Sequence, residues 1–177
     1  LAPGEIERVI DAIRASRVEA VAISLLFWFL DPTHEQRLRD ALKQALPELD
    51  VLISFDVQPE FREFPRTSTT IFAAYIAPVF RRYLETLVSE LQAADVANRL
   101  FIFQSNGGVA RPELVLRNPA TTLLSGPAGA VVGAARMSAA CGYPRLITMD
   151  MGGTSLDVCL LRDGAAEAAT AREIDYF

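Results

Sequence analysis

The apolar positions of the first sixty residues follow two periods. Residues 4–16 place Ile6 and Ile10 at helical spacing, and residues 20–26 form a continuous apolar run of the kind found in buried parallel strands. Residues 34–46 return to helical spacing and residues 51–55 to an apolar run. The order helix, strand, helix, strand predicts an α/β organisation.

Residues that cap or end helices refine these boundaries. Thr33 is placed to act as the N-cap of the second helix, with Gln36 three residues later at the spacing of a capping box. Pro47 ends that helix. The charged, aromatic segment of residues 60–68 differs from these elements, and we expect a domain boundary near it.

The second part opens with a long helical pattern over residues 67–94. Apolar side chains recur there at four-residue steps, and Pro78 inside the pattern predicts a kink or a division into two helices. Further on, the pattern predicts short strands and helices in alternation. The expected strands are residues 100–103, 145–149 and 156–161, and the expected helices are residues 111–117 and 127–140.

Composition narrows the function classes. Half of the 177 residues are apolar and the net charge is -5, so we expect a packed domain without a broad basic footprint for nucleic acid. The longest apolar run, residues 18–30, is too short to span a bilayer. Two cysteines and one histidine argue against a zinc site and suit a cytoplasmic, reducing compartment. No signal peptide is visible. The first residue is not methionine and the sequence opens directly on a helical pattern, so we expect the chain to be a fragment of a larger protein.

The strongest chemical signal is a glycine-rich turn between two predicted strands. Gly152 and Gly153 let the backbone approach a phosphate, and Thr154 and Ser155 add hydroxyl donors. Acidic residues bracket the turn, since Asp150 precedes it and Asp157 follows it. Asp150 is the candidate to hold hydrated magnesium or to orient water. A plain Gly-Gly hairpin turn explains the glycines alone, so we favour the phosphate loop.

Two further segments could contact the same ligand. The first follows a predicted strand and contains Ser105, Asn106, Gly107 and Gly108. The second contains Ser125 and Gly126 and leads into a helix, whose first amides attract anions. Each segment also has a purely structural interpretation. The first would be an ordinary Asn-Gly turn, and the second would be a helix start with small residues for close packing.

Residues 60–68 mix acids, arginines and aromatic residues. One interpretation is a solvated segment that caps the following helix through Thr67 or Ser68. The other is a buried network, in which Arg62 or Arg66 meets a carboxylate and locks two subdomains together. Both stay open at this point.

Taken together, four segments resemble the hydantoinase A / 5-oxoprolinase / acetone carboxylase β-subunit family. They are residues 60–70, 104–109, 123–129 and 150–158, in the order and spacing of the family. The resemblance implies an α/β fold of the ribonuclease-H-like (actin-like ATPase) kind, with a mixed sheet and flanking helices. Residues 1–58 would end the N-terminal lobe, and residues 59–177 would begin the hydantoinase A lobe with its phosphate-loop hairpin.

The same resemblance implies an activity. Family members use ATP and Mg²⁺ to open a cyclic amide such as a hydantoin or 5-oxoproline, commonly with a hydantoinase B-type subunit or domain. Gly152, Gly153, Thr154 and Ser155 would then bind phosphate, and Asp150 would serve magnesium or water. The alternatives are an ATP-dependent ketone carboxylase subunit and a non-catalytic actin-like nucleotide-binding module. Because the matching loop of the other lobe is missing from these residues, we expect the 177-residue chain alone to be inactive.

Overall fold

The chain forms two compact units in its computed structural model, which describes residues 4–96 and 100–166. The first unit consists of Leu1–Phe101 and Arg111–Ala120, and the second of Ile102–Ala110 and Thr121–Phe177. These units differ from the predicted division at residue 58. That division concerns the lobes of a larger protein and stays a prediction.

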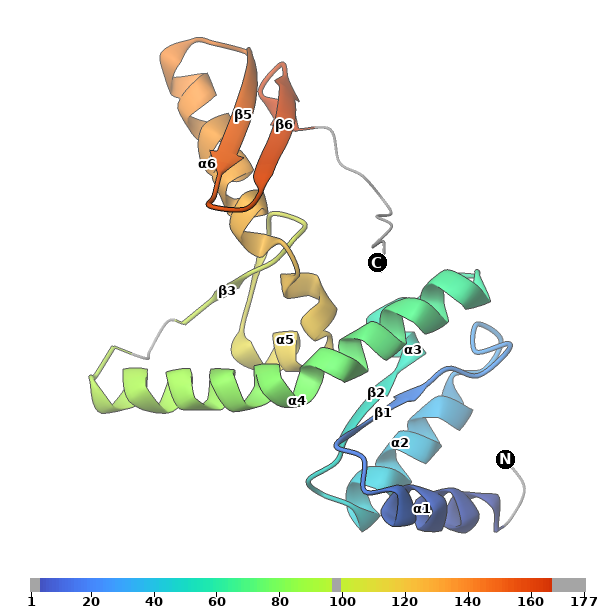
Figure 1. Cartoon of the computed structure of the whole chain (residues 1–177). Coiled ribbons are helices and arrows are strands. Elements are labelled where there is room, and N and C mark those ends of the chain that lie inside the picture. Colours follow the sequence, from blue (N-terminus) through green and yellow to red (C-terminus); the bar gives the residue numbers. More distant parts are fainter. Residues whose placement is uncertain (1–3, 97–99, 167–177) are drawn as a thin grey trace. The chain divides into compact units, whose positions relative to one another are not determined.

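The first unit begins with the predicted helix, strand, helix and strand (Figure 1). A long helix follows them and crosses one face of the two strands. The elements are α1 (Glu5–Ser16), β1 (Ala20–Ile23), α2 (Thr33–Ala45), β2 (Asp50–Ile53), α3 (Ser54–Val57), α4 (Glu63–Ala93) and α5 (Pro112–Arg117).

Strands β1 and β2 are parallel, with Ile23 opposite Ile53. Side chains alternate between the two faces of this pair, and each face is covered by helices. Val51 and Ile53 pack with α1 and α2, whereas Leu52 packs with the alanines of α4. Burial on both faces explains why the two strands read as continuous apolar runs.

Helix α4 is one element of 31 residues with Pro78 inside it, so the division into two helices, one of the two predicted alternatives, is wrong. Proline removes one backbone donor, but packing of the small buried face against β1 and β2 keeps both halves helical. Ala73, Ala74 and Ala77 form that buried face. The four-residue stripe that revealed the helix lies on its exposed side, at Ile71, Tyr75, Val79 and Tyr83.

The start of α2 also differs from the expectation. Thr33 is the first helical residue rather than the N-cap, and no side chain caps the helix from the N-cap position, Pro32. The capping acceptor is Asp31, whose Oδ1 receives the Thr33 backbone N–H at 2.9 Å. Hydrogen bonds from the Thr33 hydroxyl and backbone hold the pKa of Asp31 below its ordinary 3.8.

Replacing Asp31 by alanine should therefore cause a small, pH-dependent loss of thermal stability. A lowered pKa in the folded state means that ionised Asp31 stabilises the fold above its unfolded pKa, and that this contribution is lost as the pH falls through the folded pKa. The difference in unfolding midpoint between wild type and Asp31→Ala should be present at neutral pH and should disappear in acid, at a pH below the folded pKa. A difference that is the same at both pH values would contradict this role.

A buried ion pair joins α4 to the rest of the first unit. Arg66 and Glu35 are each 1% exposed, with Arg66 Nη1 3.6 Å from Glu35 Oε1. Arg66 also donates to the Ser54 hydroxyl and to the Leu25 carbonyl. Of the two interpretations of residues 60–68, the buried network is confirmed, but its carboxylate comes from α2 and it lies within one unit.

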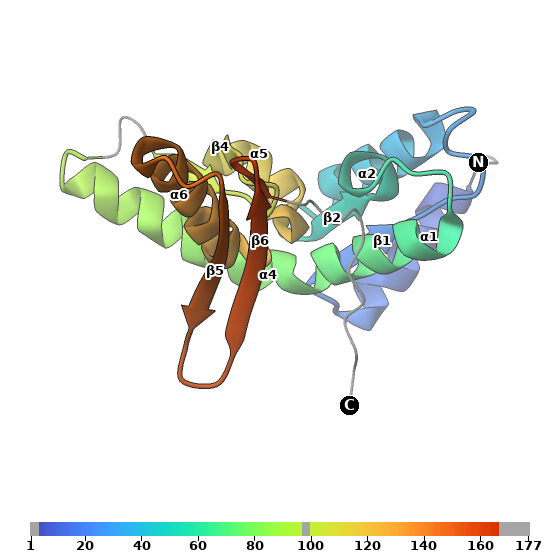
Figure 2. The ribbon, with the colours of Figure 1, turned by 90° about the horizontal axis from the view of Figure 1, so that it is seen from above.

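The second unit is a helix on an antiparallel sheet. It contains β3 (Ile102–Phe103), β4 (Val109–Ala110), α6 (Ser125–Cys141), β5 (Arg145–Met151), β6 (Leu156–Arg162) and β7 (Ala165–Ala166). The sheet order is β5-β6-β7, and α6 lies along the hairpin of β5 and β6 in both views (Figures 1 and 2). The predicted α/β class is confirmed. Within the described residues the parallel and antiparallel pairings occur in separate sheets rather than in one mixed sheet.

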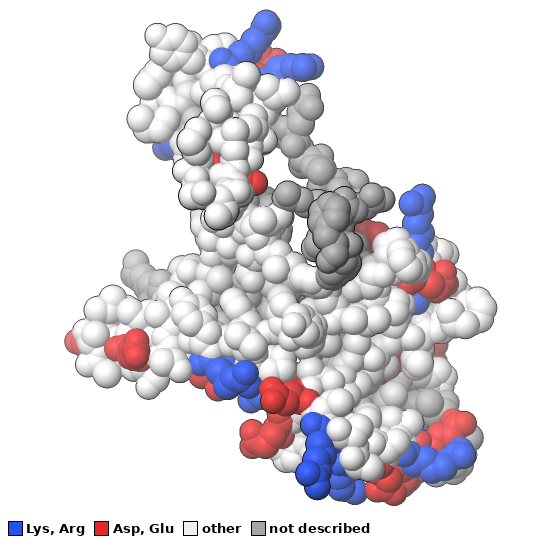
Figure 3. Space-filling model, in the orientation of Figure 1, with Lys and Arg blue, Asp and Glu red and all other residues white. Residues whose placement is uncertain are grey.

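The surface carries charges of both signs. On the face shown in Figure 3, Lys and Arg alternate with Asp and Glu over α1 and α2 instead of gathering in one basic patch. Among the described helices, none combines the length and the apolar character that crossing a membrane requires.

Candidate functional site

A groove of about 910 Å³ in the second unit is lined by parts of the predicted segments. It runs between the loop after β3, the start of α6 and the inner face of the β5–β6 hairpin. Its lining includes Ser105, Asn106, Gly107, Leu123, Leu124, Pro127, Ala128, Thr148, Asp150, Asp157 and Cys159. This volume lies within the range of pockets that hold cofactors and small ligands.

The loop after β3 is held from both ends. The Gln104 backbone N–H donates to the Gly108 carbonyl at 2.8 Å, and the Gly108 N–H donates to the Asn106 Oδ1 at 2.8 Å. Ser105 donates through its backbone N–H and its hydroxyl to the Thr121 carbonyl, at 2.7 and 2.9 Å. The loop is therefore anchored to the segment that leads into α6.

Gly107 is required by this geometry. Its φ is +83°, and a Cβ at this position would lie 3.0 Å from Val132 Cγ2 on α6. Gly107→Ala is expected to destabilise the chain by roughly 1–3 kcal/mol, because strain in the left-handed region adds to the close contact. Denaturant unfolding measures the loss. Gly126→Ala is the matched control and should be close to neutral, because a Cβ added at Gly126 would meet no atom within 4 Å.

Helix α6 begins at the edge of the groove without a side-chain cap. Its N-cap, Leu124, has φ 61° and ψ 23°, and the first intrahelical bond runs from the Ala128 N–H to the Leu124 carbonyl at 3.1 Å. The first amides of a helix are unpaired within it and attract negative charge. Pro127 and Ala128 line the groove, whereas the predicted Ser125 and Gly126 are not among its lining residues.

The hairpin contributes two carboxylates. Asp150 pairs directly with Asp157 across the antiparallel ladder, so both side chains lie on the same face, and both line the groove. Like charges at directly opposite positions destabilise an antiparallel pair. A counter-charge in the groove would remove this cost.

The tip of the hairpin lies outside the groove lining. The Gly152 N–H donates to the Ser155 carbonyl at 2.9 Å and closes the turn, and the four tip residues are exposed. The structure thus brings together five of the predicted site residues: Ser105, Asn106, Gly107, Asp150 and Asp157. The others lie on adjoining segments without lining the groove: Gly108, Ser125, Gly126, Gly152, Gly153, Thr154 and Ser155.

Several lining residues were not predicted as site residues, among them Thr148, Cys159, Leu123 and Leu124. Thr148 and Cys159 face each other on the inner face of the hairpin, where the Thr148 hydroxyl donates to the Cys159 carbonyl at 3.4 Å. The period of two along the strands was the available signal, since these residues are two positions from Asp150 and Asp157. Leu123 and Leu124 carried no such signal, because they lie in a turn.

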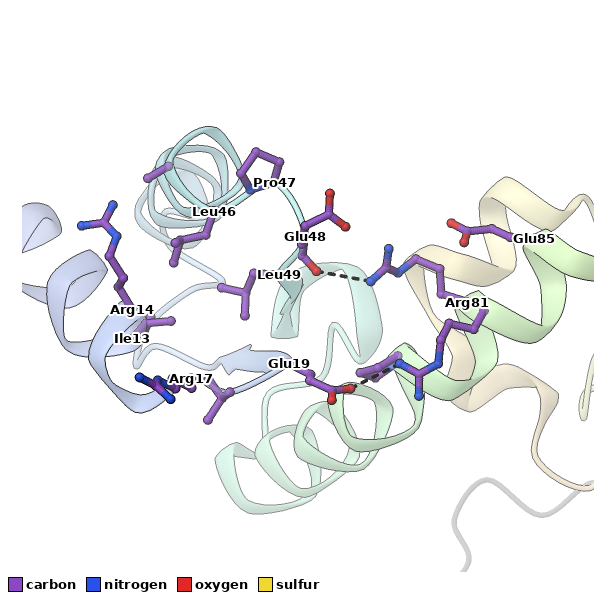
Figure 4. Close-up of a pocket in the computed structure, with 14 residues that line it drawn as sticks. Ile13, Arg14, Arg17, Glu19, Leu46, Pro47, Glu48, Leu49, Arg81 and Glu85 are labelled. Carbon is purple, nitrogen blue, oxygen red and sulfur yellow. Dashed lines mark hydrogen bonds and ion pairs between the residues drawn. The ribbon is translucent and has the colours of Figure 1, made fainter.

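A second cleft, of about 670 Å³, lies in the first unit, where α1, α2 and α4 meet (Figure 4). Many of its charges are already paired. Arg81 Nε lies 3.0 Å from Asp50 Oδ1 and donates through Nη2 to the Glu48 carbonyl, and Arg82 pairs with Glu19 at 3.3 Å. It contains none of the predicted site residues. The groove of the second unit is therefore the candidate site.

The groove offers two carboxylates for a metal ion rather than a complete cage. Within residues 4–96 and 100–166, no group of three or more His, Cys, Asp and Glu side chains is placed to hold a metal ion. Mg²⁺ usually keeps several waters and binds through one or two carboxylates together with substrate phosphates. Asp150 and Asp157 fit that pattern.

Fold and groove define an α/β module with one candidate site, and comparison with known proteins identifies its family. Residues 66–177 match the sequence model of the hydantoinase/oxoprolinase family. The match extends over more than half of the chain. The chain therefore belongs to the hydantoinase/oxoprolinase family.

Several of the curated relatives are named as enzymes or enzyme subunits. The chain is 39% identical to caprolactamase subunit alpha of Pseudomonas jessenii over 90% of its own length and 23% of the relative's. It is 31% identical to 5-oxoprolinase of Saccharomyces cerevisiae over 92% of the chain and 12% of that protein. It thus spans about a quarter or less of the length of these relatives.

A solved structure supports the fold. The nucleotide-free structure of acetone carboxylase, described as an ATP-dependent enzyme, matches with a TM-score of 0.75 and 28% identity. The match covers 90% of this chain and 23% of that chain.

Proposed function

We propose that this chain is part of an ATP-dependent hydrolase that opens a cyclic amide. The observation that carries the proposal is the groove, in which Asp150 and Asp157 meet the loop of Ser105 to Gly107 and the start of α6. Carboxylates for a metal ion, loop amides and a helix N-terminus are the groups that phosphate chemistry uses. Membership in a family whose relatives include a 5-oxoprolinase and a caprolactamase subunit supports the amide substrate.

The chemistry explains why such a reaction consumes ATP. An amide is a poor electrophile, because its nitrogen delocalises electrons into the carbonyl. Transfer of the γ-phosphoryl group to the amide oxygen breaks the bond between the β,γ-bridging oxygen and the γ-phosphorus and forms a new P–O bond. Water can then attack the activated carbon, and the C–N bond breaks as the protonated amine leaves, which gives an acyl phosphate. A second water attacks the carbonyl carbon of the acyl phosphate, so that the carboxylate forms and phosphate leaves with the former amide oxygen.

The residues of the groove would support this transfer by position and charge. Asp150 would hold hydrated Mg²⁺, with Asp157 opposite it, and the ion would neutralise phosphate charge. The glycine-rich tip, Gly152 to Ser155, offers backbone amides and hydroxyls for the phosphates from the end of the same hairpin. We propose that the tip and the groove act on one nucleotide.

The same proposal extends to the fold, the partner and the location of the whole protein. The fold of the whole protein would be of the ribonuclease-H-like, actin-like ATPase kind, with the lobe boundary near residue 58 and the matching phosphate loop on the other lobe. A hydantoinase B-type subunit or domain would supply the remaining machinery in the cytoplasm. That several relatives are named as subunits, such as acetone carboxylase beta subunit of Xanthobacter autotrophicus, supports a partner.

A second candidate is an ATP-dependent ketone carboxylase. Its support is the structural match to acetone carboxylase and 30% identity to the beta subunit. Activation of a carbonyl oxygen by phosphorylation is shared by both reactions, so the groove alone does not separate them. A non-catalytic nucleotide-binding module would bind ATP without substrate-stimulated turnover.

The test is substrate-stimulated ADP release by the full-length protein with its partner subunit. The panel contains 5-oxoproline, hydantoins, ε-caprolactam, and ketones with bicarbonate. Stimulation by a cyclic amide establishes the hydrolase, and stimulation only by a ketone with bicarbonate replaces it with the carboxylase. Nucleotide binding without stimulation by any compound would contradict both enzymes.

A further inference from the structure

The start of α6 contains a leucine whose backbone is unfavourable for leucine. Leu124 has φ 61° and ψ 23°, in the left-handed region, where a Cβ crowds the following carbonyl oxygen. Five non-glycine residues with positive φ occur in the described part of the chain: Arg17, Phe27, Asp95, Leu124 and Asp163. Of these five, only Leu124 lines the groove.

Its position in the helix is also unfavourable for leucine. Leu124 is the N-cap of α6, where Asn, Asp, Ser or Gly are preferred, and no side chain caps this helix from that position. Asparagine would tolerate the left-handed backbone and offer a capping oxygen, and glycine would remove the strain. Local structure thus favours other residues at this position on two separate grounds.

Burial does not offset these costs. The side chain of Leu124 is 48% exposed and lines the groove instead of packing in either hydrophobic core. Strained backbone conformations cluster at binding and catalytic sites, where the surrounding structure holds them. An exposed apolar side chain that is held at this position in the groove is suited to contact an apolar ligand.

We propose that Leu124 determines substrate specificity, by contacting the hydrocarbon ring of the cyclic amide. This inference rests on the proposed function and adds a contact on the substrate side. The groove has two kinds of lining, because Asp150 and Asp157 are acidic whereas Leu123, Leu124 and Pro127 are apolar. A lactam has the same division, since its reacting amide oxygen faces the transferred phosphoryl group and its methylene groups need an apolar surface.

If Leu124 contacts the lactam, its substitution should weaken lactam binding without lowering stability, and this is tested in the full-length protein with its partner. Leu124→Asn and Leu124→Gly should raise the KM for the lactam about tenfold, which corresponds to loss of most of a leucine contact. The KM for ATP should stay within about threefold of wild type. The unfolding midpoint of Leu124→Asn should equal or exceed that of wild type, because strain is relieved and a cap is gained.

Two comparisons separate a substrate contact from a structural role. Leu124→Met, which keeps an apolar side chain, should restore most of the affinity for the lactam. Met137→Asn places the same polar residue at an exposed position of α6 outside the groove lining and should leave the KM unchanged. A lower unfolding midpoint of Leu124→Asn with an unchanged KM would overturn the contact, as would a rise confined to the KM for ATP.

Direct binding distinguishes failure of this contact from failure of the proposed activity. Calorimetric titration with ε-caprolactam, in the presence of Mg²⁺ and a non-hydrolysable ATP analogue, needs no turnover. About tenfold weaker binding by Leu124→Asn supports the contact, even if the wild type hydrolyses nothing and the proposed activity fails. Equal binding by wild type and variant, or no binding by either, overturns the contact, even if the wild type hydrolyses another amide.

Discussion

Replacing Arg66 by alanine should lower the free energy of unfolding by about 3–5 kcal/mol, because it leaves a buried carboxylate without its counter-charge. Glu35 and Arg66 are each 1% exposed, so water cannot take over the lost partner. Glu35 is also fixed in place, since it accepts hydrogen bonds from the Leu25 N–H at 2.8 Å and the Ser54 hydroxyl at 2.6 Å. Urea unfolding followed by circular dichroism measures the change.

Two variants make the Arg66 measurement specific. Arg62→Ala removes an exposed arginine one turn earlier and should change the stability by less than about 0.5 kcal/mol. Glu35→Gln combined with Arg66→Met removes both charges and keeps an acceptor for the neighbouring donors. Its loss should be smaller than the sum of the single losses, since the two residues interact directly. A loss for Arg66→Ala similar to that for Arg62→Ala would show that the pair is not structurally important.

Only one partner of this ion pair could be predicted from the sequence. The charged segment of residues 60–68 indicated a buried arginine network, and Arg66 was one of its two candidate cations. The carboxylate was not predictable, because Glu35 lies far earlier in the chain on another helix. Parallel pairing of β1 and β2 brings Ser54 and Glu35 to Arg66, and such long-range contacts leave no local spacing pattern.

Helix α4 shows a second limit. Its four-residue stripe correctly predicted a helix but did not indicate which side is buried. The large residues Ile71, Tyr75 and Val79 are exposed, and the buried side consists of small residues that allow close approach to the sheet. Periodicity gives the element, whereas burial depends on the packing partner.

The candidate site was also predictable only in part. Strand periodicity and glycine-rich turns located Asp150, Asp157 and the loop of Ser105 to Gly107, which the structure brings into one groove. Leu124 was not predictable, because its importance lies in a backbone angle and in the groove that it lines. Residue type and spacing indicate candidate polar groups, but they do not indicate which apolar residue in a turn will contact a ligand.

Asp150→Asn in the full-length protein is expected to lower kcat about 10²–10³-fold, the range found when one electrostatic group at a transition state is removed. Asparagine keeps the shape of the side chain and removes the charge that would hold Mg²⁺. The Mg²⁺ concentration for half-maximal activity should therefore rise in the variant. Steady-state ADP release, measured across a magnesium titration with the best substrate of the panel, tests both effects.

Stability separates this functional loss from misfolding. Asp150 lies directly opposite Asp157 in the β5–β6 ladder, so removing one charge should relieve repulsion and stabilise the hairpin by about 0.2–1 kcal/mol. Asp163→Asn is the matched control, since it makes the same change in a turn outside the groove lining, where asparagine also tolerates the positive φ. Its activity should equal that of wild type. Activity lost together with stability in Asp150→Asn would mean that the carboxylate serves the fold, whereas activity lost from an equally stable or more stable protein assigns it to the reaction.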